Sequence, residues 1–267
     1  MTPAASPDLL AAIVAATRRA VEMRQSRIPI ATLDRHVTRE PRGGAFVEAL
    51  RSSPPPRIIA ECKRRSPSKG ILRSGYDPAS HAASYAAAGA AAISVLTEPA
   101  FFDGALDHLR AVRAAVTIPV LRKDFIVTEY QVHEAADAGA DAVLLIVSAM
   151  EDSRLKDLLA VASDLGLAAL VEVHDPDELT RASDAGARVI GVNSRNLRTL
   201  DLHPELLERV AASRSRRDQH LLVAESGIRT PDDVRSLSAA GYDAFLVGER
   251  LIAQPDPGAA LRELRTS

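Results

Sequence analysis

The chain has 267 residues, of which 46% are hydrophobic and 25% are charged, and its formal net charge is -2. This composition is typical of a folded globular protein and excludes a disordered chain. The near balance of charge and the aromatic content of only 3% argue against a nucleic-acid-binding module. The single cysteine excludes an internal disulfide framework and a zinc site built from cysteines.

Two further features predict where the protein acts. No run of about 20 apolar residues is present, so the sequence predicts no contact with a membrane. Residues 1–10 contain Asp8 and two prolines and lack the basic region of a secretion signal. We therefore expect a cytoplasmic protein.

In chain order, residues 1–56 are predicted to form an N-terminal helical extension. Only Thr17 interrupts a face of apolar residues that recur at helical spacing, namely Leu9, Leu10, Ile13, Val14 and Val21. Three prolines at 54–56 then form a stiff connector. We expect the extension to pack on residues 57–267 as part of one structural domain.

Eight short apolar runs follow, and their first residues are 20 to 33 residues apart, the spacing of a strand, a helix and two loops. Such continuous apolar runs suit strands that are buried on both faces of a parallel sheet. The predicted strands are Ile58–Lys63, Ala91–Thr97, Pro119–Asp124, Asp141–Val147, Ala168–His174, Arg188–Asn193, Leu221–Glu225 and Asp243–Gly248.

Amphipathic segments between these runs are predicted to be helices, the clearest being Pro78–Ala88, Ala105–Ala115, Glu129–Ala138, Glu151–Leu165, Pro176–Ala185 and Pro231–Ala240. Four of them end in a glycine that precedes a strand, as expected of a helix C-terminus. Eight strand–helix units predict an α/β protein with a (β/α)8 barrel, the TIM barrel. An open doubly wound sheet is the alternative, but it should carry a Gly-rich dinucleotide turn after its first strand, and none is present.

Polar residues at the predicted strand ends are the candidate site, because active sites of such barrels lie at the carboxyl ends of the strands. Side chains alternate along a strand, so Glu61 and Lys63 share one face while Cys62 faces the helices. The other strand ends supply Lys123, Glu172, Asn193 and Glu225. Buried unpaired charges are costly, so this ring of charges predicts a polar ligand bearing charge of its own.

Lysine is rare in this chain. Of the 33 basic residues only four are lysines, so 29 are arginines, yet Lys63 and Lys123 both fall at predicted strand ends. An ammonium can give up its proton when burial lowers its pKa, whereas a guanidinium cannot. We therefore expect these two lysines to be kept for function, with burial lowering the pKa of Lys123.

Small residues after the last two predicted strands suggest a phosphate site, because backbone N–H groups can approach an anion there. These residues are Ser226 with Gly227, and Gly248 with Glu249. A basic loop from Arg64 to Lys69 is predicted to be mobile and to fold over an anion. It contains the Ser-x-x-Lys spacing of penicillin-binding enzymes, but its proline and glycine favour a loop over the shared helical turn that such enzymes need.

No metal or cofactor motif is present. The seven histidines lack the spacing of metal ligands, and no Walker loop occurs. His174 follows the fifth predicted strand and is expected to reach solvent or to support a neighbouring side chain. We predict a site without metal or cofactor.

Read together, the strand-end motifs resemble indole-3-glycerol phosphate synthase of tryptophan biosynthesis from about residue 7 to about residue 262. The motifs are residues 59–70 (IAECKRRSPSKG), 121–125 (LRKDF), 170–174 (LVEVH), 191–197 (GVNSRNL) and 224–228 (AESGI). The family is a (β/α)8 barrel with an N-terminal helical extension. The resemblance implies conversion of 1-(2-carboxyphenylamino)-1-deoxyribulose 5-phosphate, an anionic sugar phosphate, to indole-3-glycerol phosphate, CO2 and water.

The resemblance also implies roles for individual residues. Lys123 would be the general acid of ring closure, and Glu172 the second acid/base group. Lys63, positioned by Glu61, would hold the substrate carboxylate, and Asn193 would hydrogen-bond the developing hydroxyl. The remaining residues implied to bind substrate are Ser66, Arg195, Glu225, Ser226, Gly227, Gly248 and Glu249.

The chain departs from the family pattern at Cys62 and Arg250, where larger apolar residues and serine are usual. The lack of a second barrel predicts that no isomerase activity is fused to it, and we expect a monomer.

Two alternative functions remain at this point. One is a phosphosugar isomerase, which typically uses Cys/Asp or Asp/Asp pairs. The other is a non-catalytic barrel that binds a phosphorylated ligand.

Overall fold

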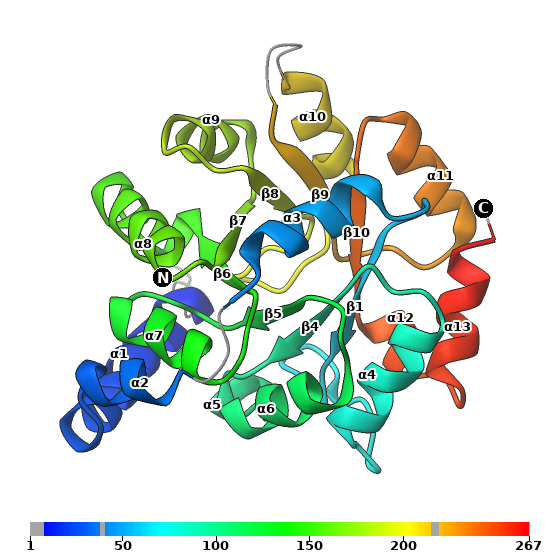
Figure 1. Ribbon diagram of the computed structural model, residues 1–267. Coiled ribbons are helices and arrows are strands. Elements are labelled where there is room, and N and C mark those ends of the chain that lie inside the picture. The colour runs from blue at the N-terminus through cyan, green and yellow to red at the C-terminus, as the bar shows by residue number, and fades with distance from the viewer. Residues whose placement is uncertain (1–7, 38–40, 215–218, 267) are drawn as a thin grey trace, which may run out of the picture.

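The computed structural model describes residues 8–37, 41–214 and 219–266 (Figure 1). The part of the N-terminal prediction that falls on residues 1–7 and 38–40 lies outside these ranges. No helix within them is long and apolar enough to cross a membrane.

Eight parallel strands close into a barrel, which confirms the predicted (β/α)8 fold. The strands are β1 (Ile58–Cys62), β4 (Ala92–Leu96), β5 (Val120–Lys123), β6 (Ala142–Ile146), β7 (Ala168–Val173), β8 (Val189–Asn193), β9 (Leu221–Glu225) and β10 (Ala244–Val247). Each pairs with the next, and β1 pairs with β10 to complete the ring. The predicted strands correspond to these eight, and most extend one residue beyond them.

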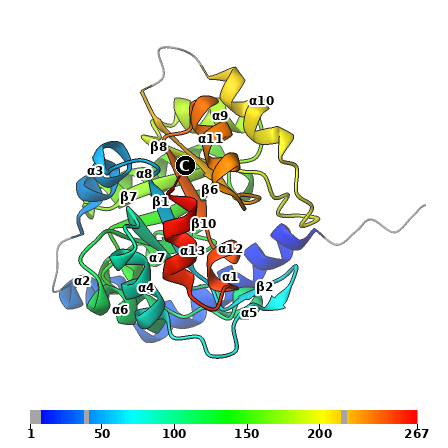
Figure 2. The same cartoon turned by 90° about the vertical axis from the view of Figure 1, so that its right-hand side faces the viewer.

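Helices surround the barrel as its outer layer. They are α4 (Pro78–Ala87), α6 (Leu106–Ala115), α7 (Glu129–Asp137), α8 (Asp152–Asp164), α9 (Pro176–Asp184), α10 (Glu205–Ser213), α11 (Pro231–Ala239) and α13 (Pro257–Leu264). Shorter pieces are α5 (Pro99–Phe102), α12 (Glu249–Ile252) and the 3₁₀ turn η1 (Val147–Ala149). The last helix, α13, packs beside α4 (Figure 2).

Local sequence signals explain where these helices begin and end. Asp77 and Asp175 accept hydrogen bonds from backbone N–H groups of α4 and α9, and each precedes a proline at the first helical position. Gly89, which follows α4, has φ 88°, a left-handed conformation that favours glycine. These caps and glycines therefore define where each helix begins and ends within its strand–helix unit.

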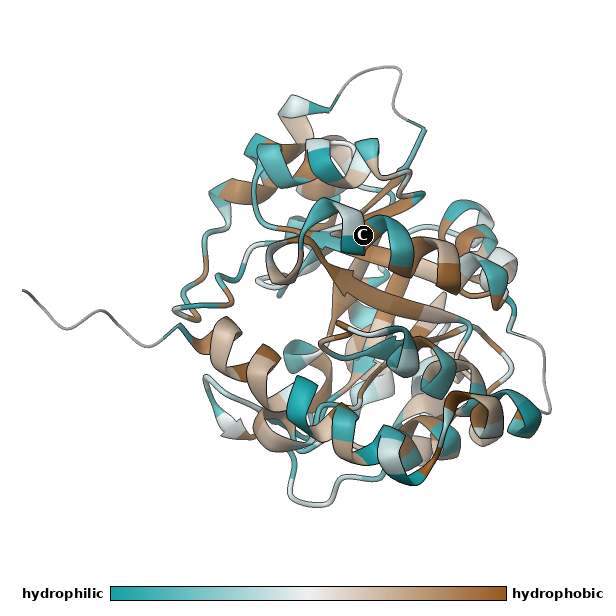
Figure 3. Cartoon of the chain, turned by 90° about the vertical axis from the view of Figure 1, so that its left-hand side faces the viewer, coloured by the Kyte–Doolittle hydropathy of each residue, from teal (hydrophilic) through white to brown (hydrophobic). Residues whose placement is uncertain are grey.

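Alternation along the strands divides the core into two layers. Side chains such as Ile59, Leu121 and Leu170 fill the barrel interior, whereas Ala60 and Val171 pack against the helices. Figure 3 shows hydrophobic strands at the centre and hydrophilic segments over the helices. The inward rows end at the carboxyl rim with polar residues, which positions the candidate site.

The N-terminal extension consists of α1 (Leu9–Arg27), α2 (Ile30–His36) and α3 (Gly43–Ser52). Leu10 and Ile13 of α1 belong to the same apolar cluster as the barrel interior, together with Phe46 of α3. The Gly43 N–H donates to the Gly166 carbonyl at 2.9 Å, and a Cβ at Gly43 would lie 2.3 Å from the Ala168 nitrogen. These contacts support the proposal that extension and barrel form one structural domain.

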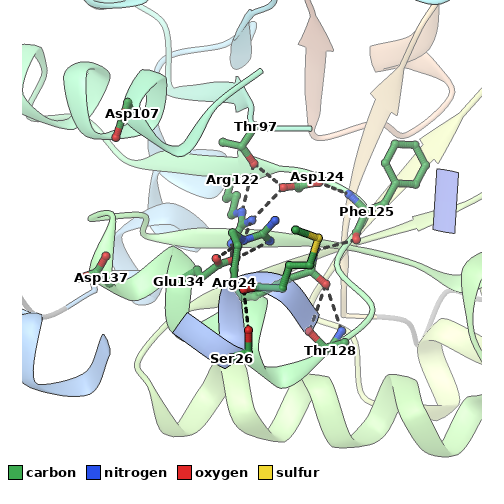
Figure 4. A network of polar contacts seen from close by, with 12 residues as sticks. Arg24, Ser26, Thr97, Asp107, Arg122, Asp124, Phe125, Thr128, Glu134 and Asp137 are labelled. Atoms are coloured by element: carbon green, nitrogen blue, oxygen red, sulfur yellow. Dashed lines mark hydrogen bonds and ion pairs between the residues drawn. The ribbon is translucent and has the colours of Figure 1, made fainter. Parts of the chain in front are cut away.

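A buried ionic network joins α1 to the strand that carries Lys123 (Figure 4). Arg24 Nε lies 2.6 Å from Glu134 Oε1, and Glu134 Oε2 in turn accepts from Arg122 at 3.3 Å. Arg122, only 1% exposed, also donates to Asp124 at 2.9 Å and to Thr97 at 3.1 Å. Because a buried guanidinium needs opposite charge, this network constrains β5 on its outer face.

We predict that Glu134→Ala lowers the free energy of unfolding by about 3 kcal/mol, because it removes a carboxylate shared by two arginines from a buried position. Urea denaturation measures the change. The control is Glu22→Ala, which breaks the exposed Arg19–Glu22 pair and should cost less than about 1 kcal/mol. Equal losses in the two variants would contradict the importance of burial.

Candidate functional site

A cavity of about 350 Å³ lies at the carboxyl ends of the barrel strands. Every residue selected from the sequence lines it, namely Glu61, Lys63, Ser66, Lys123, Glu172, Asn193, Arg195, Glu225, Ser226, Gly227, Gly248 and Glu249. Parallel register explains this convergence. For example, Asn193 pairs with Glu225 across β8 and β9, and Glu172 pairs with Gly191 across β7 and β8. The cavity is the candidate active site.

Lys123 lies at the centre of the charged groups. Its Nζ is 3.2 Å from Glu172 Oε2 and 3.4 Å from Glu225 Oε2. Burial favours the neutral amine, but the nearby carboxylates, including Glu61, outweigh it and raise the pKa of Lys123. The sequence-based expectation of a lowered pKa is therefore wrong, because several carboxylates, rather than a second ammonium, dominate around Lys123.

Glu172 and Glu225 have opposite tendencies to ionise. Burial opposes the charge on Glu172, but the Lys123 ammonium and hydrogen-bonding neighbours hold its pKa well below the usual range. Burial, with repulsion from Glu172 and Glu61, raises the pKa of Glu225 to about 8. Near neutral pH one carboxyl is therefore ionised and the other is mostly protonated, so the site holds a base and an acid together.

Glu61 and Lys63 also line the cavity and form an ion pair, with 2.5 Å between Nζ and Oε1. Alternation along β1 and its continuation directs both toward the mouth. Cys62 points to the helices, where its Sγ lies 3.8 Å from the Pro78 carbonyl, and burial raises the pKa of its thiol. A thiolate nucleophile is thus disfavoured, in agreement with the alternation argument.

Backbone at the ends of β9 and β10 forms the part of the cavity predicted to bind phosphate. Ser226 and Gly227 have φ 66° and 75°, so the chain turns sharply directly after β9. The Ser226 hydroxyl donates to Asn193 Oδ1 at 2.8 Å, which links this turn to β8. Gly248, directly before α12, brings the backbone against Glu61.

Two of the selected side chains, those of Glu249 and Arg195, are engaged in contacts with other residues of the loops around the cavity. The carboxylate of Glu249 pairs with Lys69, and the Arg195 guanidinium donates to the Leu200 carbonyl at 2.9 Å. The Arg195 N–H also donates to Asn193 Oδ1 at 3.0 Å. Arg195 therefore braces the loop after β8 and its neighbour Asn193.

The basic loop after β1 contains regular structure that the sequence did not predict. It forms an antiparallel hairpin of β2 (Arg65–Ser66) and β3 (Gly70–Ile71), and Arg64 pairs with Asp103. Two ion pairs, one at Arg64 and one at Lys69, tie the hairpin to the rim. Ser66 and Lys69 do not share a helical turn, as the sequence predicted.

The sequence did not identify the apolar wall of the cavity. Phe102 and Phe125 lie there with ring centroids 6.1 Å apart, and Leu144, Ile146 and Leu197 complete it. Aromatic and aliphatic side chains beside charged groups suit a ligand with a flat apolar part and anionic ends. The sequence provided only a weak indication of this wall, because apolar residues near strand ends are also expected in the core of any barrel.

His174 and Gly191 also shape the site, and of these two only Gly191 has no role predicted from the sequence. His174 Nε2 lies 3.3 Å from Glu172 Oε1, so it supports a neighbour, one of its two expected roles. A Cβ at Gly191 would lie 2.0 Å from Glu225 Oε1, so this position must lack a side chain for Glu225 to occupy its place. A lone glycine inside a strand pattern signals such close approach.

Within the described residues, no group of three or more His, Cys, Asp or Glu side chains is arranged to hold a metal ion.

Comparison with known proteins gives one consistent family. The family model described as indole-3-glycerol phosphate synthase matches residues 10–264. A relative of that name from Albidiferax ferrireducens is 46% identical, covering 96% of this chain and 98% of its own. Others of that name come from Streptomyces griseus, with 47% identity over 96% and 94%, and from Nocardioides sp., with 56% identity over 78% and 79%.

Solved structures show similarity in fold. Thiamine phosphate pyrophosphorylase from Pyrococcus furiosus has a TM-score of 0.60 and 20% identity, covering 82% of this chain and 96% of its own. N-acetylmannosamine-6-phosphate 2-epimerase from Clostridium perfringens has a TM-score of 0.60 and 15% identity, covering 77% and 90%. At these identities the likeness concerns the barrel alone.

We predict that Gly248→Ala lowers kcat/KM by about 100-fold, since the new Cβ would lie 2.3 Å from Glu61 Oε1 and displace that carboxylate from Lys63. Steady-state kinetics measures the loss, and thermal unfolding checks that the fold persists. Gly44→Ala is the matched control, because no atom lies within 4 Å of its added Cβ. Unchanged kinetics in Gly248→Ala would contradict the close packing of Glu61.

Proposed function

The chain belongs to the indole-3-glycerol phosphate synthase family, and we propose that the cavity at the carboxyl rim of its barrel carries out the family reaction. The enzyme is a carboxy-lyase of tryptophan biosynthesis. It converts 1-(2-carboxyphenylamino)-1-deoxyribulose 5-phosphate to indole-3-glycerol phosphate, CO2 and water. The observation that carries the assignment of the site is Lys123 between Glu172 and Glu225, facing the Glu61–Lys63 pair.

The shape of the cavity supports this choice of substrate. The substrate has a carboxylate at one end, a phosphate at the other and an aromatic ring beside the carboxylate. Lys63 matches the carboxylate, and the turn at Ser226 and Gly227 matches the phosphate, with Ser66 and Gly248 nearby. The wall that contains Phe102 and Phe125 supplies the apolar surface for the ring.

Ring closure joins the aromatic carbon that bears the carboxylate to the ketone carbon of the sugar. As this bond forms, the carbonyl oxygen gains negative charge and must receive a proton. We assign the proton to the Lys123 ammonium, which stays charged because carboxylates surround it. A raised pKa does not prevent transfer, since the developing alkoxide is a stronger base than an amine.

Decarboxylation follows, because loss of CO2 returns the electrons of the carbon–carboxylate bond to the ring and restores aromaticity. Lys63 holds the carboxylate by charge until the bond breaks, and Glu61 fixes the orientation of Lys63 at 2.5 Å. The pair is largely buried, but the Lys63 side chain is 16% exposed and can therefore be reached by the substrate.

Dehydration removes the hydroxyl formed at the former ketone carbon and a proton from the neighbouring ring position. Ionised Glu172 is the base that accepts this proton, and Asn193, which donates to Glu172 at 3.1 Å, also lies where a departing hydroxyl needs a hydrogen bond. Lys123 or the protonated carboxyl of Glu225 supplies the proton that leaves in water. The reaction consumes one proton overall, because the carboxylate leaves as CO2. Glu172 returns its proton to the cluster, and solvent supplies the second proton that restores the acid form of Lys123.

The proposed mechanism assigns every step to side chains and uses no metal or cofactor. We also propose that the enzyme is a monomer that acts in the cytoplasm. In support of a monomer, the large hydrophobic residues that are exposed within the described ranges are few, namely Met23, Ile28 and Ile71.

The direct test is to mix purified protein with the carboxyphenylamino sugar phosphate and to record indole fluorescence. We predict product formation with the native chain and a loss of about 1,000-fold in kcat for Lys123→Met, which retains the length of the side chain but cannot donate a proton. Lys156→Met, on an exposed part of α8, is the control and should react at the native rate. If Lys123→Met kept the native kcat and only raised KM, Lys123 would bind the substrate without donating a proton, and the role proposed for it would be wrong.

Lys63 gives a second prediction that concerns only the carboxylate. Lys63→Ala should lower kcat/KM by about 100-fold or more, because the leaving group loses its counter-charge, while Lys63→Arg should recover part of the rate. Release of labelled CO2 from carboxyl-labelled substrate measures this step. Native rates of CO2 release in Lys63→Ala would remove the role assigned to this ammonium.

A further inference from the structure

His174 connects the proposed base to a second carboxylate outside the substrate cavity. Its Nε2 lies 3.3 Å from Glu172 Oε1, and its Nδ1 lies 3.3 Å from Glu178 Oε2. The His174 backbone N–H donates to the same Glu178 oxygen at 2.8 Å. Glu178 therefore holds both the ring and the backbone of His174, while the far side of the ring faces Glu172.

Glu178 is itself fixed by the start of α9. Its backbone N–H donates to the Asp175 side chain at 2.7 Å, which caps the helix. A short stretch of chain from the end of β7 to the first turn of α9 thus contains an ordered series of groups. Asp175 fixes Glu178, Glu178 fixes His174, and His174 contacts Glu172.

The geometry requires a particular protonation state. A neutral imidazole has one N–H and one unprotonated nitrogen, so either tautomer would leave an unprotonated nitrogen 3.3 Å from a carboxylate oxygen. The doubly protonated ring places positive charge beside both carboxylates, with a hydrogen bond from Nδ1 to Glu178 and an ion pair between Nε2 and Glu172. This argument depends only on the position of His174 between Glu172 and Glu178.

We propose that the imidazolium of His174 is a positioning residue that fixes the orientation and negative charge of Glu172 for the dehydration step. The inference rests on the proposed function, since it takes Glu172 as the base. His174 does not line the substrate cavity, so it acts through Glu172 and does not touch the substrate. Lys123 and Asn193 contact Glu172 from other strands, and His174 contacts it from the residue directly after β7.

The surroundings of His174 agree with a positive charge. It lines a second cavity of about 530 Å³, which Asn193 separates from the first and into which the loop after β8 and α10 also project charges. The charged and titratable groups of that cavity are Asp175, Glu178, Arg198, His203, Glu205 and Arg209. Burial lowers the pKa of His174, but the carboxylates of Glu172 and Glu178 outweigh it and raise the pKa to about 10.

The protonation state is tested without substrate by ¹⁵N NMR of histidine-labelled protein, with His174→Gln used to assign the signal. We expect both ring nitrogens of His174 to remain protonated at pH 8 in the native chain. Glu178→Gln and Glu172→Gln should each move the titration to lower pH, because each removes one carboxylate from the ring. Titration of native His174 at or below its ordinary pKa of about 6.5 would overturn the proposal.

Kinetics tests the consequence for Glu172. His174→Gln keeps a neutral side chain of similar reach, and we expect about a tenfold lower kcat with KM within about twofold, because the charge of the base is less well held. Its pH–rate profile should shift at the acid side toward higher pH. His203→Gln is the matched control, because His203 also lines the second cavity but pairs with Glu205, and it should leave both parameters unchanged.

The outcomes separate the two proposals. Native kcat and a native pH profile in His174→Gln would overturn the positioning role, while loss of activity in Glu172→Gln would still support the proposed function. A fully active Glu172→Gln would instead overturn the proposed function.

The pH dependence of stability gives a separate prediction. The stability linked to the raised pKa of His174 is present below about pH 6.5 and is lost as pH rises through about 10. The unfolding free energies of the native and His174→Gln proteins should therefore converge toward high pH.

Discussion

The contact between one buried ammonium and the carboxylates around it is the constraint on which the rest of the site depends. Lys123 keeps its charge because the ionised Glu172 carboxylate lies 3.2 Å from its Nζ, and Glu172 keeps its charge because Lys123 is there. Neither group would be tolerated alone in a buried position. The barrel meets this requirement by bringing β5, β7 and β9 to a common rim, although they are far apart in sequence.

The same arrangement separates an acid from a base by the surroundings of two glutamates. Two glutamates in one cavity differ in ionisation because Glu172 has more hydrogen-bonding and cationic partners than Glu225. Gly191 contributes because it has no Cβ, which leaves room for the Glu225 carboxyl group. Two residues of the same type thus differ in pKa because their neighbours differ.

Much of the fold and of the site could be predicted from the sequence because both depend on periodic patterns. Apolar runs gave eight strands, and alternation along β1 separated Glu61 and Lys63 from Cys62. The pKa of Lys123 could not be predicted, because its sign depends on how many carboxylates the register brings within reach. The ordered hairpin at Ser66 escaped prediction for a similar reason, since the ion pairs that hold it join residues distant in sequence.

The alternation of side chains along the inward rows has a further consequence for the history of such enzymes. On β5 and β7, Lys123 and Glu172 stand two residues beyond Leu121 and Leu170, which belong to the packed interior. The catalytic side chains and the side chains that stabilise the barrel are therefore different residues of the same strands. Residues at the strand ends can be substituted while the packed interior keeps the barrel closed, so the same scaffold can acquire new reactions.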